Sequence, residues 1–354
     1  MRAAAAMGLV IAATVAAPWV IGEGVQRFLA EVFLMLAMAE MWNLLAGYAG
    51  LVSMGQQVFV GLGAYSLFFA SMSFNVAPYW VLPLALLVCA GVAAVIALFL
   101  FRLREAYFAI GMWVFSEIVS LVVSKSEWLG GERGMGLRTA RLVAARWLEP
   151  VTFWLSVAIA GGAIVGTYFL MKSRVGLGLM TVRDNDVAAA SIGVDVWRNR
   201  LIAFVVAAAG CGLAGAVSFT ATLYVAPSFA FDPNWVVEMM FIVLIGGIGT
   251  LEGPVLGAVI YFALRELVTI AFGLSAGWYL VGLGTVAIAT MLFEPAGLWP
   301  LLRDRLRVDW LSVRRIPPPL PASAVALRRA PADAATPASR YDATRDGGSS
   351  RSAG

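Results

Sequence analysis

The sequence predicts an all-α polytopic membrane protein with about ten transmembrane or re-entrant helical segments, and three observations support this fold class. Hydrophobic residues make up 61% of the 354 residues, and the mean hydropathy is +0.86. Charged residues make up only 13%, whereas a soluble domain is about one-quarter charged. The apolar residues also form long runs, and a helix of about 20 residues spans a bilayer. Most of the chain is therefore expected to lie in lipid.

The expected elements are apolar segments that follow one another along the chain. The first follows Arg2 and ends near the Ala-Ala-Pro sequence at 16–18, so a cleaved signal peptide is the alternative to an uncleaved helix. Its length favours the helix. Segment 236–248 is short and segment 51–72 is interrupted by glycines, so the count is uncertain by about two. The segments are 3–21, 28–45, 51–72, 79–101, 107–124, 151–171, 201–225, 236–248, 254–272 and 278–293.

Composition divides the chain into an N-terminal helix and short loop at 1–27, a transmembrane domain at 28–301 and a basic tail at 302–354. The tail holds ten Arg and five Asp, so it accounts for the net charge of +4 and the pI of about 9.3. The basic pI is therefore no evidence for a nucleic-acid partner. The tail is rich in Pro, Ala, Arg and Ser, which predicts disorder. A polyproline ligand for a partner protein is the alternative to a featureless cytoplasmic tail.

Residue types that are absent exclude several chemistries. The chain has no histidine, which removes His-based catalysis and His metal ligation. Its two lysines, Lys125 and Lys172, do not occur in a GxxxxGK[ST] sequence, so we expect no P-loop and no cofactor bound by this chain. Cys89 and Cys211 lie in apolar segments and are expected to be small core residues. No nucleophile–base pair or metal-ligand set is apparent, so we predict neither an enzyme nor a metal site.

The distribution of Lys and Arg predicts the orientation in the membrane. If the polar segment 172–200 is cytoplasmic, alternation places the N-terminus, the turn at 102–104 and the tail on the same side. Arg27 and the 125–149 loop then lie on the opposite side. Counted as far as Arg315, 13 Lys and Arg fall on the cytoplasmic side and 6 on the other. This orientation is favoured although the 125–149 loop is itself basic.

The segment 172–200 is a polar island between two membrane-length apolar segments. Thr181 is expected to cap a helix, and Asp184 and Asp186 would lie near the positive end of its dipole. An alanine-rich run extends the helix, and Gly193 can supply the left-handed turn that ends it. We therefore predict a helix of about three turns at 181–193 on the membrane surface, where another protein could bind. An ordinary structured loop is the alternative.

Two glycine-rich stretches interrupt the apolar segments. Residues 43–65 read NLLAGYAGLVSMGQQVFVGLGAY, and glycines at this density permit close backbone approach or a broken helix that lines a cavity. Residues 246–258 read GGIGTLEGPVLGA, in which glycines repeat every four residues, and Pro254 suits the first turn of a helix. The shared character of the two stretches suggests an internal inverted repeat around a midplane site.

Polar residues in and beside these stretches are the candidate translocation pathway. At membrane depth such groups need partners, which a transported polar solute and its water could supply; hydrogen bonding between helices is the alternative. A carboxylate within a span is a functional candidate because its burial is costly. If such acids moved protons, the protein would be a secondary transporter, and this interpretation is less favoured than a translocation pathway for a polar solute. The predicted pathway residues are Glu40, Asn43, Ser53, Gln56, Gln57, Thr250 and Glu252.

From about residue 28 to residue 300 the chain resembles the permease subunit of branched-chain amino acid ABC importers, the LivM type. Four blocks carry the resemblance: residues 43–65, the loop GGERGMGL at 130–137, GLGLMTVRDNDVAAASIGV at 176–194 and residues 246–258. The resemblance implies an ABC importer permease architecture in the bacterial inner membrane. It also implies a second homologous permease subunit, two ATPase subunits that use ATP, and a periplasmic solute-binding protein as partners.

In this resemblance the 181–193 helix is the element that docks in the ATPase. The sequence Val187-Ala188-Ala189 followed by Gly193 resembles the EAA-x3-G signature of ABC permeases, but the acidic residue is Asp186, one position early. Gln56 is a second departure, because many relatives carry histidine there. The predicted coupling residues are Arg183, Asp184, Asn185, Asp186, Ala188, Ala189 and Gly193.

The solute is left open by the sequence. Relatives of this family carry leucine, isoleucine and valine, whereas others carry urea, short amides or aromatic compounds. No charged pair in the sequence obviously binds both ends of an amino acid, which fits a permease whose selectivity resides in its binding protein. A channel or proton-coupled carrier that works alone is the alternative from a different class.

Overall fold

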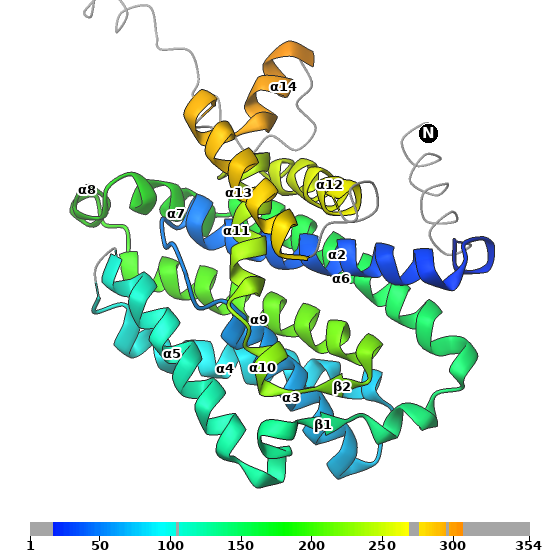
Figure 1. Cartoon of the computed structure of the whole chain (residues 1–354). Coiled ribbons are helices and arrows are strands. Elements are labelled where there is room, and N and C mark those ends of the chain that lie inside the picture. Colours follow the sequence, from blue (N-terminus) through cyan, green and yellow to red (C-terminus); the bar gives the residue numbers. More distant parts are fainter. Residues whose placement is uncertain (1–16, 104–105, 269–275, 295–296, 307–354) are drawn as a thin grey trace, which may run out of the picture. The chain divides into compact units, whose positions relative to one another are not determined.

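The computed structural model describes residues 17–103, 106–268, 276–294 and 297–306 (Figure 1). The described part is almost entirely helical, which confirms the predicted all-α fold class. Most of the predicted helix 3–21 and most of the predicted disordered tail lie outside the described residues. The α-helices are α2 (Glu23–Asn43), α3 (Gln57–Phe74), α4 (Leu82–Leu100), α5 (Ala106–Lys125), α6 (Ala145–Lys172), α7 (Arg174–Asp184), α8 (Asp186–Ser191), α9 (Val196–Thr222), α10 (Pro227–Ala230), α11 (Asn234–Gly246), α12 (Gly253–Glu266), α13 (Ala276–Phe293) and α14 (Leu298–Leu306).

Short elements connect these helices. A π-helical turn, Leu44–Tyr48, continues α2, and a two-stranded antiparallel sheet pairs β1 (Met135–Gly136) with β2 (Tyr224–Val225). The 3-10 turns are Pro78–Val81, Glu127–Leu129, Gly131–Arg133 and Arg138–Leu142. Three of these turns, from Glu127 to Leu142, lie in the predicted 125–149 loop, so this loop contains short helical turns.

Within the described residues, seven helical segments are long and apolar enough to span a membrane. Each coincides with one of the ten predicted segments, and the short segment 236–248 is lengthened because α10 and α11 join it to residue 227. Predicted segment 254–272 contains the 14-residue α12, and segment 278–293 corresponds to α13. The seven spans are Glu23–Tyr48, Gln57–Phe74, Pro78–Leu100, Ala106–Lys125, Arg146–Lys172, Val196–Thr222 and Pro227–Gly246.

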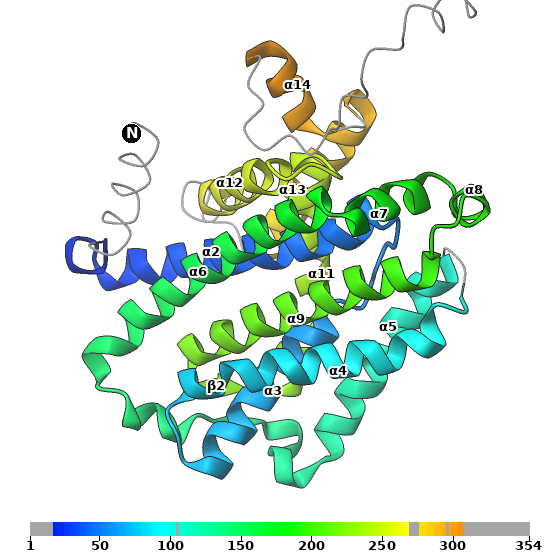
Figure 2. The same cartoon turned by 180° about the vertical axis from the view of Figure 1, so that it is seen from behind.

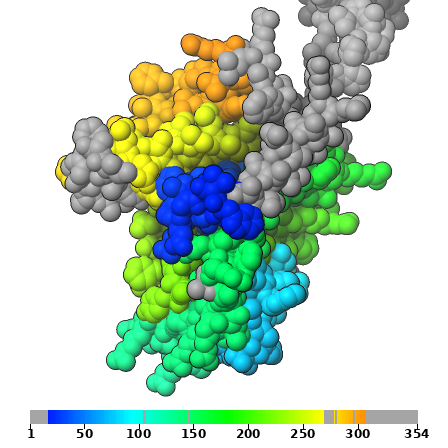
Figure 3. All heavy atoms as spheres, turned by 90° about the vertical axis from the view of Figure 1, so that its right-hand side faces the viewer, coloured from blue at the N-terminus to red at the C-terminus, as the bar shows by residue number. Residues whose placement is uncertain are grey.

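The span that contains α2 is the central one. In its most apolar window 72% of the residues are buried, against 22% for α5. Helix α2 packs against α6, α9, α11 and α12, and Figure 2 shows α6 running beside α2 along much of its length. The start of α2 and the start of α6 also lie side by side in the space-filling view (Figure 3). By contrast, α4 and α5 expose large apolar side chains such as Leu87 and Leu121, as expected of helices that face lipid.

Helices α3 and α9 approach closely through glycines. A Cβ atom added at Gly63 would lie 1.9 Å from the carbonyl oxygen of Gly212, and one at Gly215 would lie 2.5 Å from that of Val60. Spanning helices associate through small residues because lipid supplies no hydrophobic driving force between them. The glycines of these two helices therefore set the distance between α3 and α9 in the core.

Contacts group the loops in the way that the predicted orientation requires. Arg27, at the start of α2, forms an ion pair of 2.7 Å with Glu149, which belongs to the predicted 125–149 loop and lies in the first turns of α6. The same loop provides Met135, which pairs with Val225 just after α9. The start of α2, the end of α9 and the 125–149 loop therefore meet at one end of the spans. This grouping agrees with the predicted alternation, whereas the assignment of this end to the outside of the cell stays a prediction.

The α3–α9 contact yields the first testable prediction. Gly63→Ala should lower the free energy of unfolding by about 1–3 kcal/mol, because the added methyl group must displace the backbone of α9. Gly91→Ala on α4 is the matched control, since an added Cβ there has no atom within 4 Å. Thermal unfolding of the detergent-purified protein measures both variants. Equal melting temperatures for the two would contradict the close helix contact.

Candidate functional site

The side chain of Asn43 joins the two glycine-rich stretches. Its Oδ1 accepts a hydrogen bond of 2.8 Å from the backbone N–H of Gly249, and its Nδ2 donates one of 2.8 Å to the carbonyl of Thr250. Asn43 is fully buried at the end of α2, and the two partners lie in the turn between α11 and α12. Two segments about 200 residues apart in sequence are thus held together by a single amide group.

Glycine is required on both sides of this contact. A Cβ atom at Gly47 would lie 2.4 Å from Oδ1 of Asn43 and 2.5 Å from the nitrogen of Gly249. Gly249 itself has a φ of +74°, in the left-handed region that side chains disfavour. Gly47 belongs to the π-helical turn that follows α2, and π-helical turns occur frequently at functional sites. The predicted close backbone approach is therefore confirmed at these two glycines.

Arg183, from the polar island, reaches the same place. Its Nη1 donates a hydrogen bond of 2.9 Å to the carbonyl of Gly47. Its Nε and Nη2 both lie 3.2 Å from Oδ1 of Asp184. We call Asn43, Gly47, Arg183, Gly249 and Thr250 the junction. Three of the four sequence blocks that were singled out, 43–65, 176–194 and 246–258, contribute to it.

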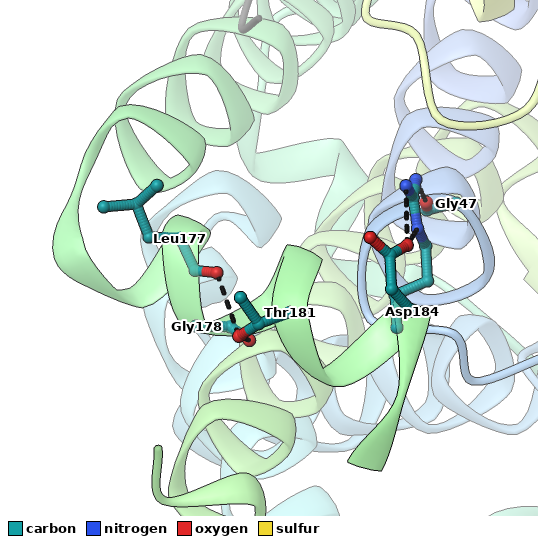
Figure 4. A network of polar contacts seen from close by, with 6 residues as sticks. Gly47, Leu177, Gly178, Thr181 and Asp184 are labelled. Atoms are coloured by element: carbon teal, nitrogen blue, oxygen red, sulfur yellow. Dashed lines mark hydrogen bonds and ion pairs between the residues drawn. The ribbon is translucent and has the colours of Figure 1, made fainter. Parts of the chain in front are cut away.

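The predicted helix 181–193 is wrong in its start and its continuity. Thr181 lies inside α7, and Figure 4 shows its hydroxyl turned toward the carbonyls of Leu177 and Gly178, 3.3 and 2.8 Å away. The cap is Asn185, whose Oδ1 accepts hydrogen bonds of 3.0 Å from the N–H groups of the second and third residues after it. Asn185 has an extended backbone, so it separates α7 from α8.

The prediction that Thr181 caps a helix fails because a threonine hydroxyl can also donate to a carbonyl of the preceding helical turn. This hydrogen bond lets threonine lie inside a helix as well as at its start. The end of the polar element was predicted correctly. Gly193 has a φ of +86° and follows α8 directly after Ile192, as the expected left-handed turn.

The predicted coupling residues do not share one surface. Asp184, Asn185, Asp186, Ala188 and Gly193 are exposed, whereas Ala189 is only 1% exposed and faces the protein. Arg183 is partly exposed, but its guanidinium is directed at Gly47. Nothing in these placements tests whether the residues contact an ATPase, so that role stays a prediction.

Two exposed apolar residues of the polar segment 172–200 were not predicted from the sequence. Val187 is 76% exposed and Ile192 is 73% exposed, although both lie in a polar segment between spans. Charged residues dominated the prediction because they are uncommon in this chain. The signal that the sequence offered was the presence of two large apolar residues in an otherwise polar segment; the structure adds that Ala189, between them, is the residue that faces the protein.

Five of the seven predicted pathway residues are packed in the core, whereas Thr250 and Glu252 are partly exposed in the turn between α11 and α12. Glu40, Ser53, Gln56 and Gln57 have no exposed surface. The Glu40 carboxylate lies beside Asn43, and Nε2 of Gln56 lies 3.6 Å from Sγ of Cys211. Among the described residues, neither polar atom of the Gln57 side chain makes a hydrogen bond. The structure thus brings Glu40, Asn43 and Thr250 to one region, and it buries Ser53 and the glutamines in the helix interior.

A cavity of about 970 Å³ lies at the opposite end of the spans, between α2, α6, α9 and α11. None of the predicted pathway residues lines it. Its charged lining consists of one arginine and four carboxylates, and aromatic side chains such as Trp235 contribute the apolar part. These charged residues are Arg27, Glu31, Glu149, Asp232 and Glu238. Two of the carboxylates are in ion pairs, Glu149 with Arg27 and Glu31 with Arg265.

Comparison with known sequences identifies the family. The sequence model of the family described as "Branched-chain amino acid transport system / permease component" matches residues 24–291. The chain belongs to this family. The match covers every element of the junction, and it confirms the resemblance inferred from the four sequence blocks.

Relatives of this permease include proteins with different named solutes. The high-affinity branched-chain amino acid transport system permease protein LivM of Salmonella typhimurium is 27% identical over 331 residues, which are 85% of this chain and 76% of its own. LivM of Escherichia coli is 27% identical over 325 residues, 83% of this chain and 74% of its own. The autoinducer 2 import system permease protein LsrC of Klebsiella pneumoniae is 30% identical over 152 residues, 40% of this chain and 41% of its own. No solved structure matches the permease.

The Asn43 bridge yields the second prediction. Asn43→Leu keeps the approximate volume but leaves the N–H of Gly249 and the carbonyl of Thr250 without their partner. We expect a loss of about 2–4 kcal/mol in the free energy of unfolding, because buried groups that lose their hydrogen bonds are costly. Thermal unfolding in detergent measures this loss. Asn234→Leu, at an exposed position of α11, is the control, and an equal effect at both positions would contradict the role of the bridge.

Proposed function

We propose that this permease is a transmembrane subunit of an ATP-driven importer that carries branched-chain amino acids or a related small polar solute into the cell. Membership of the family and the names of the LivM relatives support the transport class. The partners are a second homologous permease subunit, two ABC ATPase subunits and a periplasmic solute-binding protein. The observation that carries the proposal is the exposed apolar pair Val187, in α8, and Ile192, directly after it, between two spanning helices.

Helix α8 is the proposed ATPase contact. Exposed apolar side chains grouped on a water-facing element indicate an interaction site. Val187 and Ile192 would enter an apolar groove of the ATPase, and the charges of Asp184 and Asp186 would surround them. No GxxxxGK[ST] sequence occurs in the 354 residues, which supports placing ATP binding on a separate subunit. This role puts α8 in the cytoplasm of a bacterial cell and the permease in the inner membrane.

The cavity at the other end of the spans is the proposed entrance for the solute. It combines the guanidinium of Arg27 with carboxylates such as Asp232 and Glu238, so it offers partners for both ends of a zwitterion. Its volume lies within the range of about 300–1,000 Å³ that small-molecule sites occupy. Urea, short amides and aromatic compounds are the alternative solutes, because the relatives already differ in the solute that they are named for.

A stand-alone channel or a proton-coupled carrier is the second candidate class. The buried Glu40 beside Asn43 favours it, since an acid at membrane depth is a functional candidate. Transport by the purified permease in liposomes without ATPase subunits would support this class and reject the importer.

Crosslinking tests the α8 contact. The variants with one added cysteine are Val187→Cys, Ile192→Cys and, as a control, Ser228→Cys; Ser228 is exposed on α10 at the opposite end of the spans. Cys89 and Cys211 are buried, so the reagent should modify only the new cysteines. In the importer assembled with its ABC subunits, we expect crosslinks to the ATPase from positions 187 and 192 and none from 228. Modification of the Val187→Cys variant by a membrane-impermeant reagent in intact cells would reject the orientation.

The entrance cavity yields a prediction for transport kinetics. Glu238→Gln should raise the KM for uptake of a zwitterionic amino acid about tenfold, because a charge-assisted contact is worth about 1.5–3 kcal/mol. Glu127→Gln is the control, since Glu127 is an exposed carboxylate of the loop at the same end but does not line the cavity. Uptake of radiolabelled leucine by proteoliposomes measures both. An unchanged KM in Glu238→Gln would remove the cavity from the solute path.

A further inference from the structure

Arg183 occupies a cradle made of glycines from both glycine-rich stretches. Its Nη1 lies 2.9 Å from the carbonyl oxygen of Gly47. A Cβ atom at Gly249 would lie 3.4 Å from this Nη1, and one at Gly50 would lie 3.3 Å from the Cα and Cγ atoms of Arg183. The methylene groups and the guanidinium of Arg183 therefore lie against the backbone at Gly47, Gly50 and Gly249, where side chains would contact them closely.

The carbonyl that Arg183 binds belongs to a broken helix. After the π-helical turn the chain is irregular until α3 begins at Gln57, so carbonyls there lose the partners that a continuous helix would give. Gly47 is buried, and a buried backbone acceptor needs a hydrogen-bond donor. A charged donor makes a stronger hydrogen bond than a neutral one. The contact with Arg183 thus stabilises the broken end of α2.

Asp184 orients the guanidinium. It accepts from Nε and Nη2 on one edge, which leaves Nη1 directed at Gly47. The Arg183–Asp184 ion pair is largely exposed and contributes little to stability by itself. Its effect is to hold the arginine in the conformation that reaches the junction.

The position of Arg183 in the chain connects this contact to α8. Arg183 lies in the last turn of α7, and α8 begins three residues later, after the break at Asn185. Helix α8 is also tied to α9 by the 2.7 Å ion pair between Asp186 and Arg200. Arg200 thus links α8 to a continuous helix, whereas Arg183 links it to two discontinuous ones, α2 with its π-helical turn and α11–α12 with its turn at Gly249.

We propose that Arg183 is a positioning residue that transmits a displacement of α8 to the broken end of α2 and to the turn between α11 and α12. In this role Arg183 acts inward on the spans and is not itself the principal ATPase contact. The inference rests on the proposed function, because the displacement of α8 comes from the ATPase. Asn43 carries the movement from one broken helix to the other, since its amide holds both.

The test uses the assembled importer in nanodiscs with three variants. Arg183→Gln removes the charge and the fork of donors, and Arg183→Lys keeps the charge. Arg198→Gln is the matched control, an exposed arginine of the same cytoplasmic segment. We expect Arg183→Gln to retain ATPase co-purification and to keep ATP hydrolysis within about twofold of wild type, while leucine uptake per ATP falls at least tenfold. Arg183→Lys should recover part of this ratio, and Arg198→Gln should match wild type.

A second readout follows the junction without any transport. Hydrogen–deuterium exchange is measured on the permease alone, for peptides that cover residues 44–50 and 247–252. Arg183→Gln should raise exchange at least threefold in both peptides, and Arg198→Gln should change neither. Unchanged exchange in Arg183→Gln, or loss of ATPase co-purification with unchanged exchange, would overturn the positioning role. Failure of the α8 crosslinks would instead reject the proposed function, so the two failures are distinguishable.

Discussion

Two spanning segments of this permease, Glu23–Tyr48 and Pro227–Gly246, end in irregular backbone, and the structure depends on how the polar groups of this backbone are satisfied. Water cannot serve as the partner for backbone groups in hydrocarbon, so irregular backbone is tolerated only where protein covers it. Here each stretch of irregular backbone covers the other. Asn43 accepts from the N–H of Gly249 and donates to the carbonyl of Thr250, and the glycines at 47 and 249 allow the two backbones to come this close.

This constraint explains why the polar segment 172–200 folds against the spans. The carbonyl of Gly47 accepts from Arg183, and Gly249 has no side chain at a place where a Cβ atom would lie 3.4 Å from the same guanidinium. Arginine suits this place because its planar fork carries several donors on a long apolar stem. Since Arg183 is fixed in this way, the short α8 that follows it is held at the surface with Val187 and Ile192 outward.

The fold class and most of the spans could be predicted from the sequence, because hydropathy and length decide whether a helix crosses a bilayer. Gly193 and the close approach at Gly249 were also predictable, since a glycine in a fixed context restricts the backbone around it. The contact between Asn43 and Thr250 was not, because nothing local pairs residues about 200 positions apart. The cavity was missed for the same reason: its carboxylates come from three helices and one loop that are far apart in the sequence.

Ion pairs lie at both ends of the spans, and the packed interior between them holds mainly uncharged polar groups, which bears on how a solute could cross. At the cavity end, carboxylates and arginines are partly exposed and form pairs such as Arg265 with Glu31 at 2.6 Å. At the junction the charged groups are the buried Glu40, the partly buried Glu252 and Arg183, and the remaining polar groups are amides and backbone. A zwitterion that enters among exchangeable ion pairs must therefore lose them before it reaches the packed region of Gln56 and Gln57. That region can open only if α2, α3 or α9 moves, and of these it is α2 whose broken end is held by Arg183.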